Sequence, residues 1–178
     1  MMDWEFYILD YIRKNFSNPF FDGFMKFISF LGSWGMIWIV LAAILFFTKK
    51  YHKLGRSLGI NFIANFIACN LIIKPVVARI RPYEFNQSIN LIVSAPLDTS
   101  FPSGHTFFAF GAATIFFFYN KKVGLLMYLF AFTMAFSRLY LYVHFPTDVA
   151  FGALLGTIMA IISYNIEKLI FNKSELHK

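Results

Sequence analysis

The stretch from Ser137 to Asp148 carries an arginine, a histidine and an aspartate between two long apolar runs. Ionisable side chains are costly to bury in apolar surroundings, so such a cluster indicates a functional site. Arg138 offers a permanent cation for an anionic group. His144 and Asp148 are four residues apart, which suggests an imidazole held by a carboxylate. The cluster therefore predicts nucleophilic or acid–base catalysis on an anion.

A pair of cations precedes this cluster in the sequence, in the segment KPVVARIRP that begins at Lys74. Lys74 and Arg81 are seven residues apart, so they share a helix face if the helix continues. Two cations on one face suit a phosphate group. The alternative is a pair of interfacial cations whose long side chains reach the membrane surface. We expect Arg79 to point elsewhere, towards the interface.

The third stretch is SFPSGH, from Ser100 to His105. Ser103 and Gly104 stand where an apolar helix begins, and the free backbone N–H groups of a helix N-terminus favour an anion. Gly104 also allows close approach of the backbone to a ligand. His105 then stands beside the bound anion as a possible proton donor. The alternative is an N-cap serine followed by an interfacial histidine.

The composition points to a membrane protein. Of the 178 residues, 58% are hydrophobic and 21% aromatic, and only 14% are charged. A soluble domain of this size does not hide so much apolar surface. The net charge of +7 is not a nucleic-acid footprint, because the charges stand at the ends of the apolar runs. We therefore expect one all-α, polytopic membrane domain over residues 1–178 and no nucleic-acid partner.

The apolar runs predict a bundle of five to six helices, because a spanning helix needs roughly 20 apolar residues. Residues 1–17 are too short and too charged to span, so they are expected to form an interfacial helix, or else one packed on the bundle. Its expected apolar face is made of Trp4, Ile8, Tyr11, Ile12 and Phe16. Transmembrane helices are expected at 24–48, 56–79, 102–119, 122–142 and 146–170, with a kink near Pro75.

The lysines and arginines predict the orientation of these helices. One side gathers most of them, which makes it the cytoplasmic side: Lys49, Lys50, Lys53, Arg56, Lys121, Lys122, Lys168, Lys173 and Lys178. In chain order, no span separates the Lys74–Arg81 stretch from the Ser100–His105 stretch. Two spans separate the Ser100–His105 stretch from the Ser137–Asp148 stretch. All three are therefore expected on the extracytoplasmic side. If the N-terminal helix also spans, the N-terminus moves inside.

These three stretches resemble the signature motifs of the type-2 phosphatidic acid phosphatase superfamily. The matching residues are Lys74-x6-Arg81-Pro82, then Pro102-Ser103-Gly104-His105, then Ser137-Arg138-x5-His144-x3-Asp148. All three motifs are intact and in order, and the resemblance covers about residues 74–148.

The resemblance implies a metal-independent phosphatase that acts on lipid phosphates or diphosphates. It implies that His144 is the nucleophile and forms a phosphohistidine, that Asp148 holds its imidazole, and that His105 protonates the leaving group and then activates water. The phosphate oxygens would be bound by the remaining motif residues, Lys74, Arg81, Arg138, Ser103 and Gly104. No cofactor is expected.

A metal site is the rival interpretation of the histidines. His52 and His177 stand in basic segments, so only His105 and His144 remain near the predicted site. Two histidines beside three cations suit an anion better than a metal ion. We expect no metal.

The expected partners are the bilayer and a lipid phosphate or diphosphate. Undecaprenyl diphosphate is favoured because the predicted site faces outward. Phosphatidylglycerol phosphate, phosphatidate and lipid A phosphate are the alternative substrates. Glu84 and Asp98 are charged residues of the connecting loop, which either discriminate between head groups or are simply solvated. A phosphotransferase shares these motifs, whereas a haloperoxidase does not fit a membrane-embedded chain. The hypothesis of a transporter or structural protein would not explain why all three stretches match the motifs of this superfamily.

Overall fold

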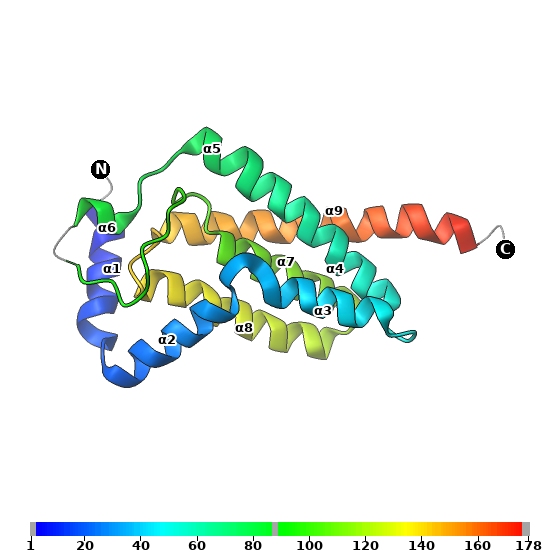
Figure 1. The fold of residues 1–178 in the computed structure, drawn as a ribbon, viewed down its shortest axis with the longest axis horizontal. Coiled ribbons are helices and arrows are strands. Elements are labelled where there is room, and N and C mark those ends of the chain that lie inside the picture. Colours follow the sequence, from blue (N-terminus) through cyan, green and yellow to red (C-terminus); the bar gives the residue numbers. More distant parts are fainter. Residues whose placement is uncertain (1–2, 87–88, 176–178) are drawn as a thin grey trace.

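The structure is a computed structural model that describes residues 3–86 and 89–175, and these contain helices and no strands (Figure 1). The expected all-α membrane bundle is thereby confirmed. The elements in chain order are α1 Asp3–Phe16, α2 Pro19–Leu31, η1 Ser33–Gly35, α3 Met36–Phe47, α4 His52–Asn65, η2 Phe66–Ile73, α5 Lys74–Val77, α6 Pro82–Phe85, α7 Gly104–Tyr119, α8 Lys121–Tyr140 and α9 Pro146–Glu175.

Helix α7 forms the centre of the bundle, where it packs against α4, α8 and α9 (Figure 1). Its sequence mixes phenylalanine with alanine and glycine and carries no formal charge, so it can be buried almost throughout. Glycines bring α9 very close to it. A Cβ at Gly156 would lie 2.2 Å from the carbonyl oxygen of Phe107, and one at Gly152 would lie 2.8 Å from that of Ser103. Small residues four apart allow this close packing.

The first expected transmembrane helix is interrupted. It was expected at 24–48 as one helix, but α2 and α3 meet at an angle of 52°. Helix α2 begins earlier, at Pro19, because Asn18 caps it by accepting a hydrogen bond of 3.0 Å from Phe21 N. The break falls in the glycine-containing segment between the helices, where Gly35 has a positive φ of 66°.

Helix α4, the π-helical η2 and α5 follow one another without interruption from His52 to Val77. The wider turns of η2 directly precede Lys74 and Pro75, where proline lacks the N–H of a regular helix. Ala78 then adopts the left-handed conformation, with φ of 47°, and ends the helix. Arg81 lies beyond this turn, so the condition for a shared helix face, that the helix continues from Lys74 to Arg81, is not met.

Helix α1 exists as expected but buries a different face. Glu5, Leu9 and Ile12 are its buried residues. Of the expected apolar face only Ile12 is buried, while Trp4 and Tyr11 are exposed. The reason is that Glu5 has partners in the bundle, which makes burial of a carboxylate possible. The alternative interpretation, a helix packed on the bundle, describes α1 in this structure.

Among residues 3–86 and 89–175, three segments, within residues 52–85, 121–140 and 146–171, are long and apolar enough to cross a membrane, and the bent pair α2–α3 qualifies as a fourth. Helix α7 is also apolar but has only 16 residues. The ends of the helices that carry the three functional stretches lie at one end of the bundle, together with α1 (Figure 1). His177 and Lys178 lie outside the described residues.

Candidate active site

The structure brings most of the expected site residues together from six segments. Lys74 opens α5, Arg81 precedes α6, Ser103 precedes α7, Arg138 lies in the last turn of α8, His144 lies in the turn after α8, and Asp148 lies in the first turn of α9. These six residues are all buried. Gly104 and His105 begin α7 and are less buried.

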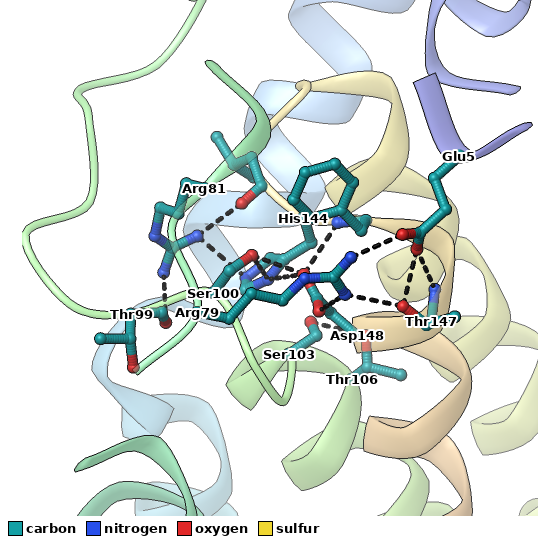
Figure 2. A network of polar contacts seen from close by, with 12 residues as sticks. Glu5, Arg79, Arg81, Thr99, Ser100, Ser103, Thr106, His144, Thr147 and Asp148 are labelled. Atoms are coloured by element: carbon teal, nitrogen blue, oxygen red, sulfur yellow. Dashed lines mark hydrogen bonds and ion pairs between the residues drawn. The ribbon is translucent and has the colours of Figure 1, made fainter. Parts of the chain in front are cut away.

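His144 presents one ring nitrogen to a cation and the other to a carboxylate (Figure 2). Arg81 Nη1 lies 3.2 Å from His144 Nε2, and a guanidinium can only donate. Nε2 is therefore the unprotonated nitrogen, and the proton is on Nδ1. Nδ1 faces Asp148 Oδ2 at 3.6 Å and the Ser100 hydroxyl at 3.5 Å. The contact with Asp148 is thus longer than a hydrogen bond, and the Ser100 hydroxyl lies beside it and donates to Asp148 Oδ2.

The surroundings of His144 keep its imidazole neutral. Burial lowers its pKa well below the ordinary value, and the positive charges of Arg81, Arg138 and Lys74 lower it further. A neutral imidazole with a free Nε2 has the lone pair that a nucleophile needs.

Asp148 is held by hydrogen bonds to both of its oxygens. Oδ2 accepts from the Ser100 hydroxyl and, at 2.8 Å, from Phe145 N. Oδ1 accepts from Arg79 Nη1 at 2.6 Å. The expectation that Arg79 points away to the interface was therefore wrong. Its helix ends at Ala78, so its side chain does not follow the helical spacing and turns instead towards the site (Figure 2).

Asp98 binds the two cations of the first motif. One carboxylate oxygen accepts from Lys74 Nζ, and the other accepts from Arg81 Nη2 at 2.7 Å. Burial would raise the pKa of Asp98, but Lys74 and Arg81 outweigh it and hold the pKa at about 2. The carboxylate is thus ionised, and it occupies the donors expected to bind a phosphate. Glu84 instead accepts a hydrogen bond from Arg81 N and caps α6.

Ser29 of α2 connects Arg138 with His105. Arg138 Nη1 donates to the Ser29 hydroxyl, and His105 Nε2 lies 3.2 Å from the Ser29 carbonyl oxygen. Because a carbonyl only accepts, His105 carries a proton on Nε2. Gly32 makes room for this ring, since a Cβ there would lie 2.6 Å from His105 Cδ2. Arg138 Nε is buried without a hydrogen-bond partner among the described residues, so this donor is unused in the structure.

The start of α7 is also arranged for an anion. Ser103 N donates to the carbonyl oxygen of Asp148 at 3.0 Å, which ties the second motif to the third. The Ser103 hydroxyl bonds with that of Thr106 and does not cap the helix. The first backbone N–H groups of α7, from Gly104 onward, are therefore left without a side-chain cap.

Several residues around the site were not found from the sequence as contributors to it. Glu5 and Ser29 belong to helices far from the motifs in sequence, and no local pattern marks them. Ser100 and Thr147 each stand next to motif residues, which was their only signal. The described residues contain no group of three or more His, Cys, Asp and Glu side chains placed to hold a metal ion. The donor set is cationic and fits an anion.

Comparison with known proteins agrees with this description. The sequence profile of the PAP2 superfamily matches residues 53–171. An undecaprenyl-diphosphatase of Sulfolobus acidocaldarius is 35% identical over 147 residues, which are 82% of this chain and 70% of that protein. A lipid A 4'-phosphatase of Bacteroides thetaiotaomicron is 32% identical over 155 residues, covering 78% of this chain and 66% of that protein.

A solved structure shares the fold. The crystal structure of Aquifex aeolicus LpxE superposes with a TM-score of 0.77 at 31% sequence identity, over 90% of this chain and 94% of that chain. The profile match covers more than half of the sequence, including all three motifs. The chain belongs to the PAP2 superfamily and is a membrane phosphatase.

Proposed function

We propose that this protein hydrolyses a lipid diphosphate, undecaprenyl diphosphate in the first place, through a phosphohistidine at His144 and without a metal ion. The observation that carries the proposal is the orientation of the His144 ring. Its unprotonated Nε2 faces Arg81, within the buried cluster of cations, and its protonated Nδ1 faces Asp148. This arrangement presents a lone pair where the phosphate donors converge.

In the first step, the terminal phosphate becomes the acceptor for Arg81 and Lys74. It takes the place of Asp98 on both cations and of His144 Nε2 on Arg81. Arg138 Nε and the N–H groups at the start of α7 supply further donors. His144 Nε2 then attacks phosphorus, and the bond from phosphorus to the leaving oxygen breaks. His105 enters this step as the imidazolium, with its Nε2–H donated to the Ser29 carbonyl, and the leaving oxygen takes its Nδ1 proton, which leaves His105 neutral. Donors fixed around the equatorial oxygens stabilise the charge of this transition state.

In the second step, His105 takes a proton from water, and the resulting hydroxide attacks phosphorus. The bond between phosphorus and Nε2 breaks, which releases inorganic phosphate and regenerates the neutral imidazole. With His105 Nε2 donating to Ser29, the Nδ1 atom of His105 is its free base. Covalent catalysis divides the hydrolysis into two easier steps, and Asp148 stabilises the charge on His144 in both.

A lipid substrate is supported by an apolar groove of about 530 Å³ next to the site. The groove is lined by Phe6, Ala78, Ile80, Phe85 and Phe145, together with Glu5 and Arg79. Phe145 directly follows His144, so a chain lying in the groove would have its phosphate close to the cations. The undecaprenyl-diphosphatase among the relatives supports this particular lipid.

The site is proposed to face the extracytoplasmic side, in a single domain whose chain crosses the membrane five times. The crossings would be made by α2–α3, by α4–η2–α5, and by α7, α8 and α9. The opposite end of the bundle carries the lysines Lys49, Lys50, Lys121 and Lys122, and such an excess is typical of the cytoplasmic side.

A lipid A phosphatase is the second candidate, because one relative carries that name. The test is phosphate release by the purified protein in detergent with excess chelator. The substrates are undecaprenyl diphosphate, lipid A, phosphatidylglycerol phosphate and phosphatidate, and His144→Ala is assayed alongside. Chelator-resistant release that His144→Ala lacks is expected, with undecaprenyl diphosphate turned over fastest. Release that a chelator abolishes, or that His144→Ala retains, would contradict the mechanism. Dependence on an added acceptor would indicate a phosphotransferase.

A further inference from the structure

A second ion-pair network, besides the one around Asp98, reaches the carboxylate of Asp148 (Figure 2). Arg79 lies at its centre. Nη1 donates to Asp148 Oδ1 at 2.6 Å and to Thr147 Oγ1 at 2.7 Å, while Nη2 donates to Glu5 Oε2 at 2.5 Å. The guanidinium also lies 4.0 Å from the centre of the Phe145 ring.

Glu5 completes the network from α1. Its other oxygen, Oε1, accepts from Thr147 N at 3.1 Å and from Thr147 Oγ1 at 2.6 Å. The Glu5 side chain is only 2% exposed, and the side chain of Asp148 is fully buried. Two carboxylates buried this close together are stable as anions only with a cation between them. Arg79 provides that cation.

We propose that Arg79 and Glu5 are positioning residues for catalysis, which fix the orientation of Asp148 towards His144 and make the site dependent on the docking of α1. Asp148 can use Oδ2 for His144 because Arg79 holds Oδ1. Arg79 keeps its fork aimed at Asp148 because Glu5 binds the second nitrogen. Thr147, bonded to both, fixes the first turn of α9 relative to α1.

This role is separate from phosphate binding. The side chain of Arg79 donates to Thr147, Asp148 and Glu5, whereas Lys74 and Arg81 bind Asp98 and Arg138 binds Ser29. Arg79 also lines the apolar groove, where methionine would keep an apolar side chain of similar length, so Arg79→Met should slow the chemical step while leaving KM nearly unchanged. The inference rests on the proposed nucleophile His144, which the His144→Ala variant tests separately.

The experiment compares kcat and KM of Arg79→Met, Arg79→Lys, Glu5→Gln and the double variant Arg79→Met/Glu5→Gln, using the lipid that the wild type turns over fastest. For Arg79→Met we expect kcat to fall by about 10- to 100-fold, as is typical when a partner that orients a reacting group is lost, with KM changed by less than about threefold. Arg79→Lys should restore only part of kcat, because one ammonium does not reproduce the two-armed guanidinium.

Thermal unfolding separates positioning from a merely structural role. Arg79→Met leaves two buried carboxylates uncompensated and should lower Tm, and the double variant, which removes one of them, should recover part of that Tm. The kcat of the double variant should stay as low as that of Arg79→Met. Recovery of kcat together with Tm would overturn the inference, as would a wild-type kcat in Arg79→Met.

The matched control is the ion pair of Arg56 with Glu167, at the other end of the bundle. It joins α4 to α9 at 2.7 Å, with side chains 17% and 3% exposed against 24% and 2% for Arg79 and Glu5. Arg56→Met should lower Tm in the same way and leave kcat unchanged. An equal loss of kcat in Arg56→Met would assign both effects to stability. Turnover by His144→Ala would reject the proposed nucleophile without bearing on this comparison.

Discussion

At the level of single residues, Asp98 stands out because it occupies the cations that the proposed mechanism needs for phosphate. Lys74 and Arg81 each donate to one of its carboxylate oxygens. The side chain of Asp98 is 55% exposed and belongs to the loop between α6 and α7, so it can leave these cations without disturbing a helix. A substrate phosphate then competes with a carboxylate of the protein itself.

The substitution Asp98→Asn should therefore lower KM for the lipid phosphate. Water screens the half-exposed carboxylate of Asp98, so each of its two ion pairs contributes about 1 kcal/mol or less, and a decrease of at most about 30-fold is expected. Steady-state kinetics measure it, with Asp3→Asn as a control that changes the net charge equally at an exposed position of α1. An increase in KM would mean that Asp98 holds the two cations in place for the substrate.

The pH dependence of kcat/KM depends on His144. Protonation removes its nucleophilic lone pair, so activity is lost as pH falls through its pKa. Because burial and the neighbouring cations lower this pKa well below 6.5, the acid limb of the wild type should lie below pH 6.5. Lys74→Met removes one cation, raises the pKa and should move the acid limb to higher pH. The substrate titrates equally in both proteins, so a limb that does not move would contradict this electrostatic account.

At the level of the helices, the contact between α7 and α9 determines whether the motifs meet. Ser103 N donates to the carbonyl oxygen of Asp148 across this contact. The approach depends on Gly152 and Gly156, whose missing side chains leave room for the backbone of α7. Helix packing at this point therefore sets the distance between the anion-binding helix start and His144.

Gly156→Ala should separate the two helices, because the added Cβ would lie 2.2 Å from Phe107 O. Overpacking of this kind costs about 1–3 kcal/mol, so Tm and kcat/KM should both fall. Gly59→Ala is the matched control, since nothing lies within 4 Å of a Cβ there. It shares the gain in helix propensity, about 1 kcal/mol, without the clash. Equal behaviour of the two variants in thermal unfolding and turnover would contradict the packing argument.

At the level of the whole molecule, the functional loops lie at one end of the bundle, and the Lys49–Lys50 turn and the start of α8 at Lys121 lie at the other (Figure 1). Helix α1 packs at the functional end, because Glu5 binds Arg79 and Thr147. The proposed orientation therefore places α1 on the extracytoplasmic side together with the site.

Cysteine labelling in intact cells tests this orientation. Leu97, which is fully exposed in the loop before α7, and Lys50, which is exposed at the opposite end, are each replaced by cysteine. A membrane-impermeant maleimide should label Leu97→Cys in intact cells and Lys50→Cys only after lysis. Cys69 is the single native cysteine and is fully buried, so its background should be low. The reverse labelling pattern would invert the proposed topology.

The sequence alone determined the membrane character, the helical class and the three motifs, because hydrophobicity and the spacing of charged residues are local properties. It also predicted most helix positions to within a few residues. It placed the break between α2 and α3 inside a single helix, because the apolar run continues across Gly32 and Gly35 and hydrophobicity does not distinguish a bent span from a straight one.

Only the tertiary structure decided which charged residues meet. Arg79 was assigned to the interface on helical spacing, but the left-handed turn at Ala78 ends the helix and redirects it to Asp148. The partners Glu5 and Ser29 lie 74 and 76 residues away in sequence from Arg79 and His105, respectively. Contacts over such separations depend on how the helices pack, and local sequence patterns do not contain that information.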